Sequence, residues 1–443
     1  VVTTRRETDG SFFVSAKVYD VYRETTAKPE PADEEHLVLS VTLYRLLSGI
    51  LGFAPPWGVL YGVRPAKLMH RLCAQMGDDA AVAHFQTAFL TQKSKAELAH
   101  EVMLHENRSI ARSGPKSFSL YVSIPFCPTR CAYCSFVSHS IEKTHKLMTP
   151  YVDLLLRELE ETSKYAKELG LELATVYFGG GTPTTLSAQD LGRIFTTIEQ
   201  NFDLSHLMEY TVEAGRPDTV TRERLEVIRA AGVQRISINP QSFNDKVLEA
   251  IGRRHTAQQT LDAFALARDC GFDHINMDFI AGLPEDDLPS FQRSIQTALD
   301  LQAESITVHT LALKTSAYMV TREQTFDLKD RLTVSNMVDY AGQTLHGAGY
   351  YPYYMYRQSK SLGNLENVGW CKPGYDCLYN VYMMDETHTV LAVGAGAVTK
   401  LRGQNSGMIE RIYNYKYPYE YIRDFDTLLE RKKRIPGFYA EYD

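Results

Sequence analysis

Two hydrophobic periods alternate along the middle of the chain. Short runs of β-branched and aromatic residues predict strands, and longer segments with apolar residues three or four apart predict amphipathic helices. The predicted strands are Ser119–Phe126, Thr175–Phe178, Glu209–Glu213, Arg235–Ser242, His274–Ile280 and Ser305–Leu313. The predicted helices are Tyr151–Leu169, Ala188–Phe202, Arg222–Ala231, Ala257–Cys270 and Ser290–Leu301. Three of these helices follow capping residues, which are Ser187, Thr221 and Thr256.

Six strand–helix units in succession indicate a parallel sheet, because parallel neighbours need a helical crossover. The pattern leaves two α/β architectures open. One is a curved, incomplete version of the eight-unit barrel, and the other is a flat doubly wound sheet.

The two ends of the chain have different patterns. Before residue 112, an alternating strand at 12–18 precedes a proline- and acid-rich linker at 28–35 and several helical segments. Beyond residue 320 tyrosine becomes dense, which is typical of half-buried strands or packed aromatic interfaces. We therefore predict an α+β extension at residues 1–112, a (βα)6 core at 113–320 and a C-terminal α/β domain at 321–443.

Composition narrows the functional classes. The 443 residues include 47 Lys and Arg against 54 Asp and Glu, a net charge of −7 that disfavours a nucleic-acid partner. The most apolar stretch, Leu37–Phe53, is interrupted by polar residues and is shorter than the ~20 apolar residues of a membrane span, so it predicts a buried helix. No apolar signal segment opens the sequence, and the odd total of seven cysteines favours a reducing compartment. We expect a cytoplasmic protein with no nucleic-acid or membrane partner.

Three of the seven cysteines lie within eight residues, spaced as Cys127-x3-Cys131-x2-Cys134 after the first predicted strand. Thiolates this close can bind one metal centre, and soft sulfur suits zinc or iron–sulfur. A structural zinc site normally takes four protein ligands, and His139 is the nearby candidate for a fourth. Three cysteines alone instead fit a four-iron cluster with one iron open to a non-protein ligand.

This spacing after the first strand of a (βα)6 chain resembles the radical S-adenosylmethionine (SAM) superfamily. In that superfamily three cysteines hold a [4Fe–4S] cluster, its open iron binds SAM, and electron transfer cleaves SAM to methionine and a 5′-deoxyadenosyl radical. The resemblance implies a partial (βα)6 TIM-like barrel with one or two SAM molecules and a flavodoxin- or ferredoxin-type electron donor. It also implies that the cluster ligands are Cys127, Cys131 and Cys134.

Further motifs follow the ends of later strands. Gly179-Gly180-Gly181-Thr182-Pro183 ends the second strand, where glycines allow close backbone approach and free amides can bind the methionyl end of SAM. Glu213 ends the third strand, and its carboxylate suits the SAM ammonium. By resemblance, the SAM contacts are Tyr121, Tyr133, Gly180, Gly181, Thr182, Glu213, Gln241, Arg253, Asp278 and Ala312, with Val398 as a further member.

The residues of these motifs, over 116–313, are similar to those of oxygen-independent coproporphyrinogen III oxidases. Two other segments, 57–65 and 363–369, resemble a clostridial and bacillar branch named as coproporphyrinogen dehydrogenases. The resemblance implies oxidative decarboxylation of two propionates of coproporphyrinogen III to vinyl groups in anaerobic haem biosynthesis, in a cavity completed by the C-terminal domain. The substrate's four carboxylates need cationic partners, and the candidates are Arg64, Arg254 and Arg357.

Two departures from these relatives leave other functions open. The best-studied branch has a fourth cysteine where this chain has Phe136. Related haem chaperones use a His-Asn-x-x-Tyr-Trp motif for haem, and the corresponding stretch, Tyr379-Asn380-Val381-Tyr382-Met383-Met384, lacks both the His and the Trp. The alternatives to a decarboxylase are therefore a haem chaperone on the same scaffold and a transferase that uses SAM both as radical source and as methyl or methylene donor.

Overall fold

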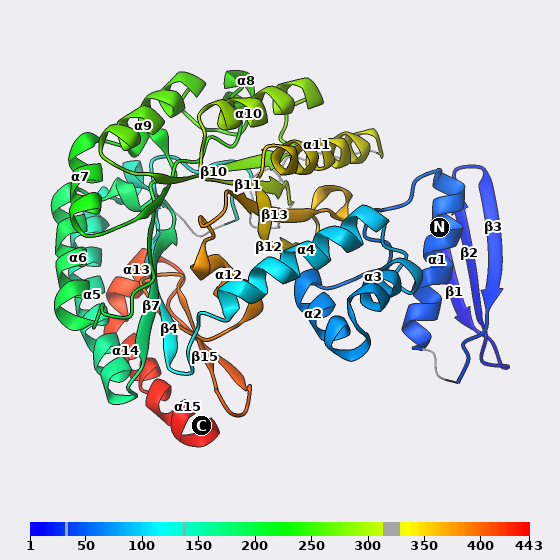
Figure 1. Ribbon diagram of the computed structural model, residues 1–443, viewed down its shortest axis with the longest axis horizontal. Coiled ribbons are helices and arrows are strands. Elements are labelled where there is room, and N and C mark those ends of the chain that lie inside the picture. The colour runs from blue at the N-terminus through cyan, green and yellow to red at the C-terminus, as the bar shows by residue number, and fades with distance from the viewer. Residues whose placement is uncertain (32–33, 136–138, 313–327) are drawn as a thin grey trace. The chain divides into compact units, whose positions relative to one another are not determined.

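The computed structural model describes residues 1–31, 34–135, 139–312 and 328–443. Phe136 and the predicted strand end at Leu313 lie outside the described residues. The chain forms two compact units, and Figure 1 shows their elements. The smaller unit comprises Val1–Leu104, Met355–Ser359 and Gly363–Glu366, and the larger unit comprises His105–Tyr354, Lys360–Leu362 and Asn367–Asp443.

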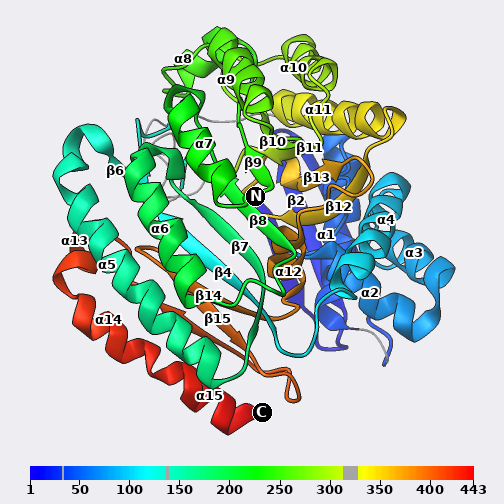
Figure 2. The same cartoon turned by 60° about the vertical axis from the view of Figure 1, so that its left-hand side comes forward.

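The larger unit is built on six parallel neighbouring strands in the order β11-β10-β9-β8-β7-β4. Their sheet curves and helices cover its outer side (Figures 1 and 2), so the partial TIM-like barrel is confirmed over the flat doubly wound alternative. The structure places these strands close to their predicted positions, at β4 (Ser117–Ile124), β7 (Glu172–Gly180), β8 (Glu209–Glu213), β9 (Arg235–Ser237), β10 (His274–Ala281) and β11 (Ser305–Thr310).

The helices between these strands begin where local sequence signals predict. The side chains of Ser187, Thr221 and Thr256 each accept a hydrogen bond from a backbone amide three residues on, which satisfies an N–H left open at the helix start. The exception is α5, which starts ten residues before the predicted Tyr151 and includes Pro150. The helices are α5 (Ile141–Glu168), α6 (Ala188–Asn201), α7 (Arg222–Ala230), α8 (Asp245–Ala250), α9 (Ala257–Asp269) and α10 (Leu288–Asp300).

Strands from the C-terminal part of the chain extend both ends of this sheet. At one end, β13 (Glu366–Cys371) pairs antiparallel with β11, and β12 (Tyr351–Arg357) follows it. At the other end, β14 (Thr389–Val393) pairs parallel with β4, followed by β15 (Val398–Arg402) and β16 (Ile409–Tyr413). The helices of this part are α11 (Leu328–Gly347), α12 (Leu378–Asp385), α13 (Pro418–Arg423), α14 (Phe425–Lys432) and α15 (Arg434–Tyr442).

A buried ion pair joins α14 to α5, which lie side by side in Figure 2. Lys432 Nζ lies 2.6 Å from Glu158 Oε1, and neither side chain is exposed. Glu158 also accepts hydrogen bonds from the Tyr421 hydroxyl at 2.6 Å, the Gly394 amide at 2.7 Å and the Asn414 side chain at 2.8 Å. A buried charge is tolerated only when it is paired and hydrogen-bonded in this way.

The smaller unit contains the antiparallel sheet of β1 (Val2–Arg6), β2 (Phe12–Val18) and β3 (Val21–Ala27). Helix α1 (Glu35–Leu51) packs one face on this sheet. Leu46 is its one fully buried residue, so the helix predicted as buried is half-exposed. Three more helices follow, which are α2 (Pro65–Met76), α3 (Asp78–Thr87) and α4 (Lys93–Ile110). No helix within the described ranges is long and apolar enough to cross a membrane.

The two branch-specific sequence segments meet in the smaller unit. Glu366 accepts a hydrogen bond from Trp57 Nε1 at 2.6 Å and lies 2.7 Å from Lys95 Nζ, with all three side chains buried. Arg357 Nη1 donates to the Leu60 carbonyl at 2.6 Å. Burial opposes ionisation of Glu366, but Lys95 and Trp57 together hold its pKa below the ordinary value.

Candidate active site

The cysteine loop begins at the carboxyl end of β4, where barrel enzymes of this type place their chemistry. Cys127 ends β5 (Phe126–Cys127), which pairs with β6 (His139–Ser140). Cys131 is buried, and Cys127 and Cys134 are half-buried. The Ala132 amide donates to the Ile251 carbonyl at 2.9 Å, which ties this loop to the end of α8.

Two polar side chains approach the cysteine sulfurs. Thr182 Oγ1 donates to Cys127 Sγ at 3.5 Å. Arg216 Nη1 donates to Cys131 Sγ at 3.6 Å and to Thr129 Oγ1 at 3.2 Å. Its other two nitrogens bind the two carboxylate oxygens of Asp218 at 3.0 and 3.1 Å. The sequence reasoning missed Arg216, although its position directly after the third parallel strand offered a signal.

The three cysteines do not form a site for one ion. Within the described ranges, three ligand atoms lie mutually within 4.8 Å only at a different place, and the loop cysteines do not meet that limit. His139, the candidate fourth zinc ligand, instead packs its ring edge-on against Tyr417 and Tyr419. Three thiols with wider spacing fit a cluster in which each cysteine binds a different iron.

The glycine motif (residues 179–183) packs directly on residues 124–126, the end of the strand segment that leads into the cysteine loop. Gly180 has φ +101°, and a Cβ on Gly181 would lie 2.5 Å from the Phe126 carbonyl oxygen, so neither position tolerates a side chain. The amides of Gly181 and Thr182 donate to the carbonyls of Ile124 and Phe126 at 2.7 Å each. The expectation that these amides are free to bind SAM is therefore wrong for Gly181 and Thr182, because the backbone of residues 124–126 already occupies them.

Glu213 lies beside a stack of three tyrosines inside the barrel. Tyr177 donates to Glu213 Oε1 at 2.7 Å, and the Tyr177 ring stacks on Tyr379 of α12 at 4.4 Å and on Tyr121 of β4 at 6.3 Å. Burial raises the pKa of Glu213 to about 7, against the smaller opposing effect of the Tyr177 hydrogen bond. A cationic ligand beside this carboxylate would therefore stabilise its ionised form, which burial disfavours.

Gln241 follows β9 and contacts the fifth parallel strand, β10, whereas Arg253 follows α8 and contacts the cysteine loop. Arg253 is buried and donates to the Tyr133 hydroxyl at 3.1 Å and to the Asn239 carbonyl at 2.6 Å. Gln241 has φ +66°, which is rare for a residue with a side chain and is typical of functional sites. Its backbone forms a bridge with Phe279 of β10 that maintains this conformation.

Asp278 points from β10 toward β11. Its carboxylate accepts from Asn276 Nδ2 at 2.7 Å and lies 3.8 Å from His309 Nε2. Burial raises the pKa of Asp278, but His309, the Asn276 hydrogen bond and the charge of Arg235 together outweigh burial and keep that pKa below the ordinary value. Ala312 follows β11 and bridges to Ser361, whereas Val398 lies on β15, two strands from β4.

Several buried polar atoms of this region lack hydrogen-bond partners in the described part of the chain. They include Gln241 Oε1, Asn239 Oδ1, Arg253 Nε and both ring nitrogens of His255. Burial and the charges of Arg253 and Arg216 lower the pKa of His255 to about 3, so its ring is neutral at pH 7. Buried polar groups are normally paired, and this concentration indicates a site shaped for a polar ligand.

A cavity of about 710 Å³ opens beside the cysteine loop in the larger unit. Of the three arginines predicted to face a substrate, Arg254 lines it and pairs with Glu142 at 2.6 Å. Arg357 is instead a buried backbone-binding residue of the smaller unit. The lining residues are Thr129, Arg130, Ser140, Glu142, Asp245, Glu249, Gly252, Arg253, Arg254, His255 and Thr256.

The fold and the site define a class of protein. Residues 121–298 match the family described as the radical SAM superfamily, which uses a [4Fe–4S] cluster and SAM. Coproporphyrinogen III oxidase from Escherichia coli, solved as a radical SAM enzyme, has a similar fold with a TM-score of 0.55 and 22% sequence identity. The similarity covers 73% of this chain and 72% of that one.

Sequence similarity narrows the class further. The oxygen-independent coproporphyrinogen-III oxidase-like protein HemZ of Bacillus subtilis is 36% identical over 89% of this chain and 79% of its own length. The haem chaperones HemW of Bacillus subtilis and Haemophilus influenzae are 31% and 30% identical, over 79% and 78% of their lengths. The chain therefore belongs to the oxygen-independent coproporphyrinogen-III oxidase-like family of radical SAM proteins.

Proposed function

We propose that the chain catalyses oxidative decarboxylation of coproporphyrinogen III, converting two propionates to vinyl groups to form protoporphyrinogen IX. In each round one hydrogen atom leaves the propionate β-carbon, its carboxylate leaves as carbon dioxide, and one electron passes to an external acceptor. The observation that supports this proposal most is the single constellation of cysteines, acids and buried arginines at the ends of six parallel strands, in a chain of this family.

We assign the cluster to Cys127, Cys131 and Cys134. When bound, the cluster and SAM supply a 5′-deoxyadenosyl radical. Glu213 would balance the SAM ammonium and Asp278 would accept hydrogen bonds from its ribose hydroxyls, because both are half-buried acceptors within the barrel. The stacked tyrosines would keep water away from these groups. The complete set proposed for SAM is Tyr121, Tyr133, Gly180, Gly181, Thr182, Glu213, Gln241, Arg253, Asp278, Ala312 and Val398. In this set Gly181 and Thr182 contribute through atoms other than their occupied amides.

The substrate carboxylates need cations near the barrel mouth. Arg254 is the best placed of the predicted arginines, because it is exposed and lines the cavity beside the cysteine loop. Arginine suits this role because its planar guanidinium can bind a carboxylate through two hydrogen bonds.

The position of Tyr379 supports catalysis over haem delivery. Tyr379 stands where the chaperone motif has its histidine, and its ring is buried in the tyrosine stack. Its backbone amide donates to Glu209 at 3.2 Å, so α12 holds this residue inside the barrel. A side chain packed in this way does not present a ligand to an exposed haem.

The test is anaerobic incubation of cluster-loaded protein with SAM, a reductant and coproporphyrinogen III. We expect carbon dioxide and vinyl-containing product. Stoichiometric haem retention without turnover would instead favour a chaperone, and deoxyadenosine release without carbon dioxide would favour a transferase.

The cluster assignment has its own test. Cys131→Ala should lose most of the iron and the visible absorption of the cluster, because one of the three cysteine ligands, the buried one, is missing. Cys270→Ala is a matched control, since this thiol is half-buried but lies at the end of α9. Equal iron content in both variants would contradict the assignment.

A further inference from the structure

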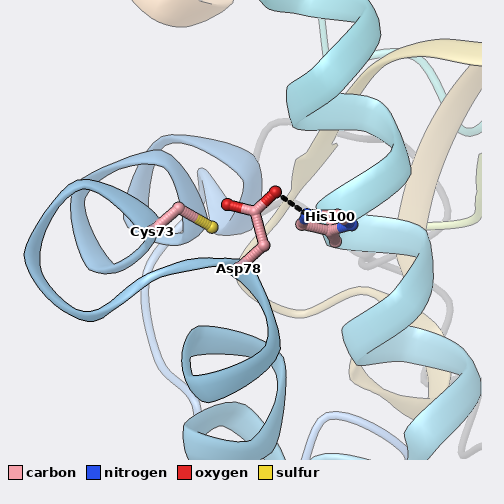
Figure 3. A group of neighbouring side chains, drawn as sticks. All are labelled: Cys73, Asp78 and His100. Carbon is pink, nitrogen blue, oxygen red and sulfur yellow. Dashed lines mark ion pairs between the residues drawn. The ribbon is translucent and has the colours of Figure 1, made fainter.

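Three possible metal ligands meet where α2, α3 and α4 come together in the smaller unit. Cys73 lies in the last turn of α2, Asp78 begins α3, and His100 lies on α4. Figure 3 shows the three side chains converging. One ligand atom from each lies within 4.8 Å of the other two, and within the described ranges no other trio of His, Cys or acidic residues does so.

The helix junction brings these residues together by a specific turn. Gly77 separates α2 from α3 with φ +84°, a conformation that residues with a Cβ rarely adopt, and its amide donates to the Cys73 carbonyl at 2.9 Å. This turn returns Asp78 toward Cys73, although five positions separate them in the sequence. His100 then approaches from a helix that begins fifteen positions after Asp78.

The contacts among the three side chains are incomplete without a further group. His100 Nε2 is shielded from solvent and lies 3.1 Å from Asp78 Oδ2, but it has no hydrogen bond of acceptable geometry. The Cys73 thiol is half-buried and faces the Asp78 carboxylate. A cation between the three groups would give the sulfur, the ring nitrogen and the carboxylate a common partner.

We propose that Cys73, Asp78 and His100 bind a zinc ion, with water as the fourth ligand. Thiolate, imidazole and carboxylate are all zinc ligands, whereas magnesium and calcium require oxygen ligands. Ligands of one tetrahedral zinc lie about 3.3–3.8 Å apart, so side-chain shifts of about 1 Å close the site. Binding transfers the thiol proton to solvent, and the exposed side of Asp78 leaves room for the water.

Such an ion would hold the end of α2, the start of α3 and the middle of α4 in one arrangement. Zinc binding to the folded chain would raise its thermal stability by mass action. This proposal is independent of the proposed decarboxylase activity, because none of the three residues belongs to the cluster or SAM set.

The experiment must prevent zinc from binding the cluster cysteines. We would use the full chain with Cys127, Cys131 and Cys134 replaced by serine, and measure zinc stoichiometry by elemental analysis after equilibrium dialysis. Cobalt(II) is the second probe, since its thiolate charge-transfer absorption reports sulfur ligation directly. Cys73→Ser and His100→Gln are the test variants, and Cys270→Ser is the matched control at another half-buried cysteine.

The proposal predicts one zinc per chain, a thiolate-to-cobalt band and a higher melting temperature with zinc. Cys73→Ser and His100→Gln should each lose these properties, whereas Cys270→Ser should retain them. Circular dichroism of the metal-free variants separates ligand loss from misfolding. A chain that binds no zinc at micromolar concentration, or folded test variants that bind it as well as the control, would overturn the proposal.

Discussion

At the residue scale, Glu213 is a site residue whose charge is unfavourable to the fold. Its pKa of about 7 exceeds the ordinary value of 4.5, so its ionisation costs stability as the pH rises through that interval. We expect Glu213→Gln to increase the free energy of unfolding by ~1–3 kcal/mol at pH 8 and hardly at all at pH 4.5. Chemical denaturation without SAM at both pH values measures this difference.

The same substitution should weaken SAM binding, because the neutral amide cannot balance the ammonium. Glu430→Gln is the control, since that carboxylate is exposed on α14 and lies outside the site. If Glu213→Gln bound SAM as tightly as the unaltered chain, Glu213 would have no role in binding the ammonium.

Arg216 gives a second prediction at this scale. Its N–H donates to the buried sulfur of Cys131, and such hydrogen bonds are one determinant of iron–sulfur potentials. We expect Arg216→Gln to lower the reduction potential of the cluster by tens of millivolts, where ~59 mV corresponds to a tenfold change in a one-electron equilibrium. An anaerobic redox titration followed by electron paramagnetic resonance provides the measurement.

Exposed Arg222 is the control for Arg216. An Arg216→Gln cluster with full iron content and an unshifted potential would show that this hydrogen bond holds the loop without tuning the cluster.

At the element scale, the pair of Lys432 and Glu158 holds α14 on α5. Removing one partner of a buried pair leaves an uncompensated charge, so Lys432→Met should cost about 3–5 kcal/mol of unfolding free energy. The double variant with Glu158→Gln should recover part of this loss, because no charge is then buried. Urea unfolding of both single variants and the double variant measures the coupling, and additive losses would contradict it.

The limits of prediction from sequence are also clearest for elements. Parallel strands, capped helices and the residues at strand ends were predictable, because they depend on neighbours in the sequence. The pairing of β14 with β4, the contact of Trp57 with Glu366 and the contact of Arg216 with Cys131 were not, because each joins distant segments through folding. The occupied amides of Gly181 and Thr182 were missed for the same reason.

At the scale of the whole molecule, the two ends of the chain should differ in how much they contribute to the stability of the barrel and to cluster binding. Residues 1–52 include β1–β3, α1 and the apolar core between them, formed by Phe12, Val14, Ala16 and Leu46. Removing residues 1–52 therefore should leave cluster iron content and cooperative unfolding of the remaining chain intact. Iron analysis and thermal unfolding of the shortened chain are the measurements.

Truncation after residue 387 is the matched comparison, of similar length. It removes β14 and Lys432, which opens one edge of β4 and leaves Glu158 without its cation. We expect this chain to be insoluble or to unfold without cooperativity. If it instead retained iron and melted sharply, the C-terminal strands would be dispensable for the barrel.

The parallel pairing of β4 with β14 also has a consequence for how the protein matures. The strand that leads into the cysteine loop borders β7 on one side and β14 on the other, and β14 spans residues 389–393. Until residues 389–393 have been made and have left the ribosome, that second edge has no partner. We therefore expect stable loading of iron and sulfide to follow the pairing of β14 with β4, when the loop first has its complete support.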